Sequence, residues 1–129
     1  MTQKPVEMIL MRQLASTLAT PAFMVDADGT LVFFNEPAEA VLGVRFEESG
    51  EMPASEWSTR WAQTDAHGRT LPPERLPLME ALTERRPAQA SFFIEGPDGR
   101  RRHITVTAFP LLRAADHVLG AVALFWESA

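Results

Sequence analysis

The sequence predicts an α+β domain with one five-stranded antiparallel sheet, short helices on one face of the sheet and an amphipathic helix at the N-terminus. Three observations predict this class. A hairpin signal near the start runs directly into a helix signal, turn and helix signals fill the middle, and the last third carries three strand-like runs. The 129 residues have the usual size of one domain.

The first predicted element is a helix over residues 5–19. Its apolar residues recur at helical spacing and are Met8, Met11, Ala15 and Leu18. Pro21 ends it, because the residue before a proline disfavours the helical region. The apolar face of this helix must be buried on the sheet or on a second copy of the chain. The helix holds only two heptads, which is too few for a coiled coil. We expect residues 1–20 to be a capping and dimerisation helix and residues 21–127 to be the domain proper.

The hairpin comes next. Two apolar runs, 22–25 and 31–34, flank an Asp-Ala-Asp-Gly turn at residues 26–29, which is a strong short-range hairpin signal. Asn35 then suits the N-cap of a helix that ends at Gly43. The two turn aspartates are explained by bonds to their own backbone, without any acid–base role.

The middle of the chain predicts short helices. Within residues 44–70, Trp57 and Trp61 stand four apart, so one helical face could turn both rings inward. Residues 73–86 suit a further helix. Pro77 is tolerated only in the first turn of a helix, so we expect this helix to begin one or two residues later than Pro73.

The last third predicts three sequential antiparallel strands. They cover Ala88 to Glu95, Arg100 to Leu112 and His117 to Trp126, joined by a Gly-Pro-Asp-Gly turn and by a polar loop at 113–116. Alternation assigns one face to Phe92, Ile94, Ile104, Val106, Ala108, Val118, Gly120, Val122 and Leu124. It assigns the opposite face to Leu119, Ala121, Ala123, Phe125, Phe93 and Phe109. Since this second face is also apolar, the N-terminal helix of the same chain or of a second copy should cover it.

The order of helix, two strands, short helices and three strands resembles the PAS domain. The residues that carry the resemblance are the turn and helix start within 25–43, the Gly-Pro-Asp-Gly-Arg turn at 96–100 with its strands, and residues 65–78, which look like the stretch before the last helix in many bacterial signalling PAS domains. The resemblance covers residues 15–127. The resemblance implies a PAS fold whose inner sheet face and helices enclose a ligand cavity, and whose flanking helix and outer sheet surface signal to a partner.

The residue types narrow what such a cavity could hold. Photosensory members of this family form a flavin adduct, or attach a cinnamoyl pigment, through a cysteine, and this chain has none. Haem-binding members commonly use a histidine on the last helix, and residues 73–86 contain none, so haem is not expected. His67, His103 and His117 do not stand at a metal-ligand spacing. No serine elbow or phosphate-binding loop occurs either.

Charge and hydropathy bear on partners and location. Twelve Lys plus Arg against seventeen Asp plus Glu give a net charge of −5, and Arg100–Arg102 is the longest basic run, so we expect no direct nucleic-acid partner. The apolar stretch Val118–Trp126 is too short to span a bilayer, and residues 1–20 lack a secretion signal. We expect a cytoplasmic protein without a membrane partner.

The candidate ligand-binding residues are large apolar side chains predicted to point inward. They are Phe23, Val25, Phe33, Trp57, Trp61, Met79, Leu82, Phe92, Ile94, Ile104, Val106, Val122 and Leu124. Such walls suit a fatty acid or another hydrophobic molecule, with Arg60, Arg75 and the indole N–H groups as candidates to hold a carboxylate. The same side chains could equally fill the core by themselves.

The candidate homodimer contacts lie on the first helix and on the outer sheet face. They are Met8, Met11, Ala15, Leu18, Leu119, Ala121 and Phe125. The leading hypothesis is therefore a homodimeric, non-enzymatic PAS sensor, standing alone or feeding an output domain such as a histidine kinase. Two alternatives stay open. One is a ligand-free protein–protein interaction module, and the other is a small cone-shaped α+β enzyme of the isomerase kind, which needs an acid inside the cavity.

Overall fold

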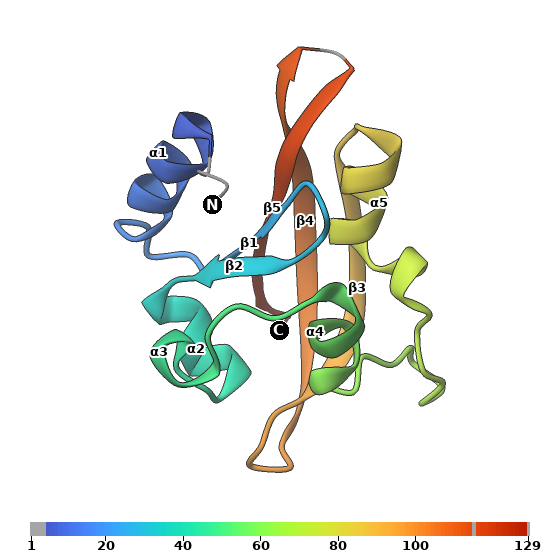
Figure 1. The fold of residues 1–129 in the computed structure, drawn as a ribbon. Helices are drawn as coiled ribbons and strands as arrows, with labels where there is room; N and C mark the ends of the chain where they lie inside the picture. The colour runs from blue at the N-terminus through green and yellow to red at the C-terminus, as the bar shows by residue number, and fades with distance from the viewer. Residues whose placement is uncertain (1–4, 115, 129) are drawn as a thin grey trace.

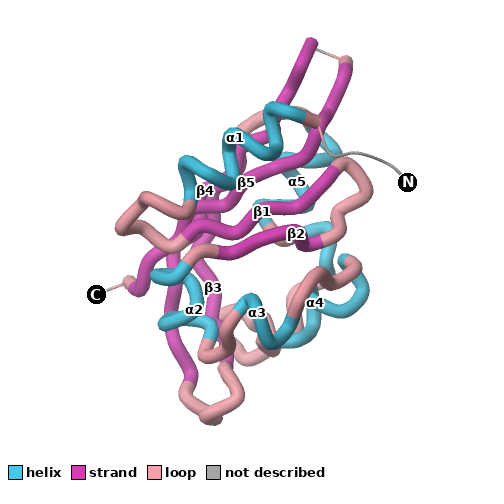
Figure 2. The backbone as a smooth tube through the Cα atoms, turned by 60° about the vertical axis from the view of Figure 1, so that its left-hand side comes forward, coloured by secondary structure: helices cyan, strands magenta, loops and turns pink. Residues whose placement is uncertain are grey.

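The computed structural model describes residues 5–114 and 116–128 and has the predicted α+β architecture (Figure 1). Its elements, in chain order, are α1 Val6–Ala15, β1 Ala22–Asp26, β2 Leu31–Phe34, α2 Glu36–Leu42, α3 Phe46–Ser49, α4 Ala54–Arg60, the 3₁₀ turn η1 Pro73–Arg75, α5 Pro77–Glu84, β3 Ala88–Glu95, β4 Arg101–Ala114 and β5 His117–Glu127. The strands form one antiparallel sheet in the order β2-β1-β5-β4-β3. Figure 2 shows α1 on one side of this sheet and the other helices gathered on the opposite side.

The hairpin and the first helix after it form where their sequence signals predict. Asp26 Oδ1 accepts hydrogen bonds from the backbone N–H groups of Asp28 and Thr30, at 2.9 and 3.1 Å. Asn35 Oδ1 accepts from Ala38 N at 3.1 Å and caps α2. Gly43 ends that helix in the left-handed conformation, at φ +78°. These contacts are local, which is why the sequence alone predicted them.

Two helix boundaries differ from the predicted ones. Helix α1 ends at Ala15 rather than at residue 19, because Ser16 N makes the last helical bond, to the Arg12 carbonyl. Thr17 N and Leu18 N then bond only three residues back, to Leu14 and Ala15, as turns. The predicted helix over residues 73–86 divides into η1 and α5. Pro77 is the first residue of α5, where its missing N–H costs no helical hydrogen bond.

Apolar side chains form one core on each side of the sheet. The inner core lies between the sheet and helices α2, α4 and α5, and contains both tryptophans, Trp57 and Trp61. The outer core lies between the sheet and α1, and is centred on Met8, Met24 and Val122. Gly120 permits the close approach of α1, since a Cβ there would lie 3.0 Å from the sulfur of Met8.

The predicted facing of β5 was wrong over residues 121–125, whereas Val118 and Leu119 lie on the predicted sides. Ala121, Ala123 and Phe125 belong to the inner core, whereas Val122 and Leu124 pack on the outer side. Alternation with period two separates two sets of residues but does not say which set faces inward. Here both sets are apolar because α1 covers the second face, so composition did not distinguish them.

Bulges change the facing further. The register passes from Leu111 opposite Gly120 to Leu112 opposite Val118, so Leu119 bulges and joins the outer core. A similar shift in β2 brings Phe33 to the outer side, where the Arg12 guanidinium lies 4.6 Å from its ring centroid. Phe33 was therefore wrongly predicted to face the inner core.

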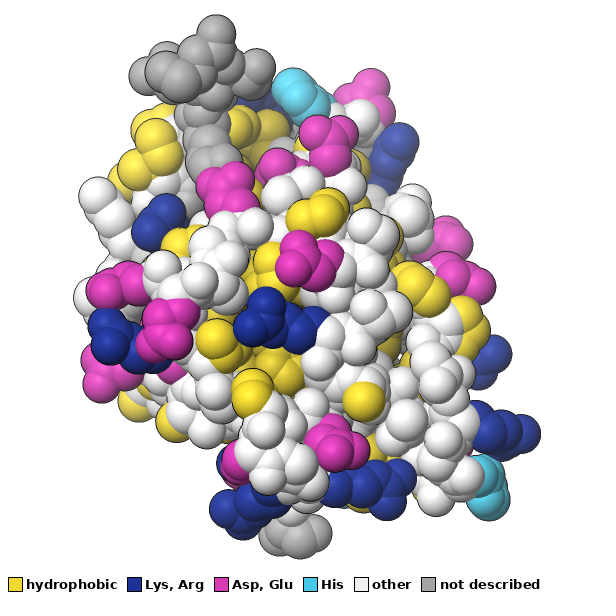
Figure 3. Space-filling model, turned by 60° about the horizontal axis from the view of Figure 1, so that its bottom comes forward, with side chains coloured by type: hydrophobic (Ala, Val, Ile, Leu, Met, Phe, Trp, Pro, Cys, Tyr) yellow, Lys and Arg dark blue, Asp and Glu magenta, His cyan; other side chains and the backbone are white. Residues whose placement is uncertain are grey.

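The surface carries both signs of charge. On the face seen in Figure 3, basic and acidic side chains are interspersed, and hydrophobic side chains gather between them. No helix within residues 5–114 and 116–128 is both long and apolar enough to cross a bilayer.

Candidate ligand-binding cavity

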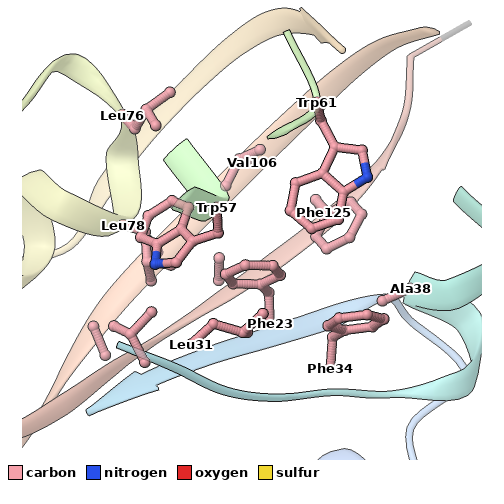
Figure 4. Packing of buried hydrophobic residues seen from close by; sticks show 14 of the residues in the cluster. Phe23, Leu31, Phe34, Ala38, Trp57, Trp61, Leu76, Leu78, Val106 and Phe125 are labelled. Atoms are coloured by element: carbon pink, nitrogen blue, oxygen red, sulfur yellow. The ribbon is translucent and has the colours of Figure 1, made fainter. Parts of the chain in front are cut away.

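A small cavity of about 60 Å³ lies in the inner core, between the sheet and helices α4 and α5. Its walls are apolar apart from one amide and two indole groups. The lining residues are Phe23, Leu42, Trp57, Trp61, Gln63, Leu76, Pro77, Leu78, Phe92, Ile94, Ile104, Val106, Ala123 and Phe125. Figure 4 shows both tryptophans and Phe125 grouped around Phe23.

The aromatic rings hold one another in fixed orientations. Phe23 meets Trp57 and Trp61 edge-on, with ring centroids 5.3 and 6.1 Å apart. The indole N–H of Trp57 donates to the Gly29 carbonyl at 2.8 Å, and that of Trp61 donates to the Leu42 carbonyl at 3.0 Å. Both indole donors are thus occupied by the protein, so neither is free for a ligand.

Gln63 is the remaining polar side chain at the cavity. It is buried, and its Nε2 donates to the Trp57 carbonyl at 3.1 Å. Its Oε1 has no hydrogen-bond partner in the part of the chain that the structure describes. The preceding residue, Ala62, takes the left-handed conformation at φ +46°, which is uncommon for a residue with a Cβ.

The predicted ligand-binding residues divide into three groups. Those that line the cavity are Phe23, Trp57, Trp61, Phe92, Ile94, Ile104 and Val106. Those that belong to the inner core away from the cavity wall are Val25, Met79 and Leu82. Those that pack on the outer side are Phe33, Val122 and Leu124, so the inward orientation predicted for them was wrong.

Several lining residues were missed. Ala123 and Phe125 were assigned to the outer face, an error that follows from the misread facing of β5. Leu76 and Leu78 flank Pro77, and this apolar pair at the start of a helix was a signal that could have been used. Gln63 carried no sequence signal, because a lone glutamine in a polar segment is usually exposed.

The candidates for holding a carboxylate do not reach the cavity. Arg60 and Arg75 are exposed and do not line it. Arg60 instead lies against the Trp61 ring, 5.6 Å from its centroid. With both indole donors also occupied, the predicted set of carboxylate-holding groups was wrong.

The predicted dimer contacts are divided between the two faces. Met8, Ala15 and Leu119 are buried in the outer core within one chain, and Ala121 and Phe125 lie in the inner core. The structure therefore packs α1 on its own sheet. The apolar residues that α1 leaves exposed are Val6, Ile9, Leu10 and Leu14.

An ion pair fixes α1 to the β4–β5 hairpin. Arg113 donates from Nε and Nη2 to the two carboxylate oxygens of Glu7, each at 3.0 Å. These hydrogen bonds lower the pKa of Glu7 to about 2. The ion pair thus links the first turn of α1 to the end of β4.

The histidines do not gather at the cavity. His67, His103 and His117 are all exposed. Among the described residues, no group of three or more His, Cys, Asp or Glu is placed to hold a metal ion.

The family model that matches this chain and the solved structures similar to it both concern PAS and LOV domains. The family model of the PAS fold matches residues 9–125. No curated protein sequence matches the chain. The solved structures similar to it include a LOV protein from Rhodobacter sphaeroides, with a TM-score of 0.75, 15% identity and coverage of 97% of this chain and 69% of that one.

Two further similar structures are PAS domains. The domain from Bordetella pertussis BvgS has a TM-score of 0.60 and 16% identity, covering 95% of this chain and 86% of that one. The domain of nitrogen regulation protein NR(II) from Vibrio parahaemolyticus has a TM-score of 0.63 and 15% identity, covering 92% of this chain and 98% of that one. At these identities the likeness concerns the fold.

Proposed function

Because this chain belongs to the PAS family, whose members are sensory and signalling domains, we propose that it is a sensor that binds a small hydrophobic molecule in the inner cavity. The observation that carries the proposal is the cavity itself, lined by aromatic and aliphatic side chains on the inner face of the sheet. Binding rather than catalysis is proposed because no acidic or basic side chain is among the lining residues that the structure describes.

Size and charge favour a small neutral ligand over a fatty acid. The cavity measures about 60 Å³, whereas pockets for drug-sized ligands measure roughly 300–1,000 Å³. A fatty acid would need a much larger opening of the core. It would also bury a carboxylate without a cation beside it, which costs free energy.

A route from the cavity to α1 supports a sensory role. Phe34 packs in the inner core, and the adjacent Asn35 donates through Nδ2 to the carbonyl of Ala15, at the end of α1. A ligand that displaced β2 would therefore pull on α1. We propose that α1 passes this change to a second copy of the chain, through its exposed apolar residues, and to an output domain or partner protein.

The ligand-free interaction module remains the second candidate. It is favoured by the small volume of the cavity and by the exposed apolar residues Leu10 and Leu14 on α1. In that case the aromatic side chains serve only as a packed core, and α1 is the functional surface.

Native mass spectrometry of protein purified from cells, followed by denaturing extraction, separates the two candidates. The sensor predicts a co-purified small molecule that is lost when Ala123, in the cavity wall, is replaced by Leu. The control is Ala90→Leu, which adds the same bulk to a half-buried strand position away from the cavity. A wild-type dimer without any extractable molecule would favour the interaction module.

A further inference from the structure

We infer that the cavity recognises a neutral molecule with a small apolar body and a single N–H or O–H donor, which the side-chain carbonyl of Gln63 accepts. This inference rests on the proposed function, since it requires that a ligand occupies the cavity. It adds the chemical class of that ligand and the residue that selects it.

The orientation of the Gln63 amide is fixed by its surroundings. The side chain is 6% exposed, and its Nε2 donates to the Trp57 carbonyl at 3.1 Å. A carbonyl can only accept, so the NH₂ end of the amide must face Trp57 and the Oε1 end must point elsewhere. That Oε1 has no partner among the described residues, and buried acceptors are normally satisfied.

The backbone around Gln63 is held on both sides. Its carbonyl accepts from Leu71 N at 2.9 Å, and Thr64 exchanges two 2.9 Å hydrogen bonds with Phe93, on the edge strand β3. Before it, Ala62 is held at φ +46°. Strained backbone of this kind persists where the surrounding structure enforces it, often at ligand sites. The amide is therefore positioned before any ligand arrives.

The remaining cavity wall defines the ligand by exclusion. Both indole N–H groups donate to backbone carbonyls, and Gln63 Nε2 uses one of its two N–H groups on the Trp57 carbonyl. Among the described lining side chains, a ligand acceptor is thus left with the second Gln63 N–H alone. A carboxylate anion would face the Gln63 oxygen without a compensating cation. A donor on an apolar body would instead satisfy Oε1 and bury its remaining surface against Phe23 and its neighbours.

The volume limits the size of this molecule. The space of about 60 Å³ corresponds to roughly four to six waters, since one water needs about 10–15 Å³ in this measure. A short alcohol therefore fits with little rearrangement. Phenol needs an outward shift of the wall formed by Leu76, Pro77 and Leu78, which comes from one loop and the start of α5.

Matched probes test the inference on the purified chain. Phenol and toluene have nearly the same shape and differ in the donor, while 1-propanol tests the smaller size and benzoate tests the anion. Binding is followed by ¹H–¹⁵N NMR titration of the cavity residues. Phenol should bind about tenfold more tightly than toluene, 1-propanol should bind at the same residues, and benzoate should not bind. Equal binding of phenol and toluene would overturn the inference, with Oε1 then satisfied by water alone.

Two variants test whether Gln63 causes the preference for phenol over toluene. Gln63→Met keeps the length of the side chain and removes the acceptor, so phenol and toluene should then bind within about twofold of each other. Ser58→Ala is the control, because the Ser58 hydroxyl is also buried without a hydrogen-bond partner among the described residues but does not line the cavity. This variant should keep the tenfold preference, and its loss in both variants would overturn the assignment to Gln63. If Gln63→Met does not fold, the comparison of phenol with toluene on the wild-type chain still decides.

The two possible failures are distinguishable. If phenol and toluene bind equally, the cavity is a binding site and only donor recognition is wrong. If no probe binds and no molecule co-purifies, ligand binding as proposed is wrong as well, and the core is filled by its own side chains.

Discussion

Asn35 donates a hydrogen bond from Nδ2 to the carbonyl oxygen of Ala15 at 2.8 Å, which joins the end of α1 to the start of α2. The same Nδ2 donates to the Thr20 carbonyl at 3.0 Å. Its Oδ1 accepts from Ala22 N and Ala38 N, at 3.0 and 3.1 Å. One buried side chain thus connects the outer helix, the first strand and the helix that follows the hairpin.

Replacing Asn35 by Ala should therefore destabilise the fold by about 3 kcal/mol. The change removes a helix cap, worth about 1 kcal/mol, and leaves buried backbone groups without partners, each costing about 1–3 kcal/mol. Urea unfolding followed by tryptophan fluorescence measures the loss, since Trp57 and Trp61 are buried.

A matched exposed turn provides the control for this variant. Asp65 Oδ1 also accepts two backbone hydrogen bonds, from His67 N and Arg69 N, but in a loop open to solvent. Asp65→Ala should cost less than about 1 kcal/mol because water can replace the lost acceptor. Equal losses in the two variants would mean that burial and the link to α1 contribute nothing.

The hairpin and the Asn35 cap were predictable because each depends on contacts within a few residues. The Asp26 turn and the cap from Asn35 to Ala38 need no knowledge of distant strands. The bond from Asn35 to Ala15 was not predictable, since it joins residues twenty positions apart. Local signals therefore predicted the elements, and the order of these elements supported the family resemblance.

The candidate site was only partly predictable. Val122 and Phe125 face opposite sides of the sheet, yet both are large and apolar, because helices cover both faces. The bulge at Leu119 depends on pairing with β4 and could not be predicted from the residue types alone. Gln63 is turned inward by pairing of its neighbours with distant segments, so its place at the cavity required the three-dimensional structure.

Gly120→Ala should destabilise the protein by about 2 kcal/mol. The added Cβ would overlap the carbonyl oxygen of Val25, in the neighbouring strand, and would lie 3.0 Å from the Met8 sulfur. Overpacking of this kind costs about 1–3 kcal/mol, and the carbonyl cannot withdraw without disturbing the β1–β5 pairing. Differential scanning calorimetry should show a lower Tm, and an unchanged Tm would contradict the predicted close approach of α1.

Gly99→Ala is the control for that substitution. Gly99 lies at φ +73° in an exposed turn, where the nearest atom to an added Cβ is Glu95 Oε1, at 3.9 Å. This variant tests backbone strain without crowding, and should cost about 1 kcal/mol. A larger loss at Gly99 than at Gly120 would assign the effect to backbone conformation.

The Glu7–Arg113 pair should make the docking of α1 depend on pH. The pKa of Glu7 is lowered from 4.5 to about 2 by its hydrogen bonds to Arg113. A lowered carboxyl pKa means that the pair stabilises the docked helix above pH 4.5, and that this contribution is lost as the pH falls from 4.5 to 2. Hydrogen exchange of the α1 amides should thus be faster in Glu7→Gln than in wild type at pH 6.

The difference between wild type and Glu7→Gln should narrow when hydrogen exchange is initiated at successively lower pH, and should also narrow at high salt, because both partners are partly exposed. Glu47→Gln is the control, since Glu47 forms an exposed ion pair with Arg45, a residue outside α1. A difference that stays constant from pH 6 to pH 2 would show that ionisation of Glu7 does not hold the helix.

The proposed homodimer should depend on the outward side of α1. Leu10 and Leu14 are 58% and 53% exposed and stand one turn apart, so changing both to Glu should raise the dimer Kd by about 100-fold and leave the fold intact. Sedimentation velocity measures the change. Gln13→Glu is the control, since it adds a negative charge to an exposed polar position of the same helix.

In contrast, Met8→Glu should unfold the protein, because Met8 is 2% exposed against the sheet. A dimer that persists in the Leu10→Glu, Leu14→Glu variant would remove this side of α1 from the interface and leave the uncovered part of the outer sheet face as the surface to test.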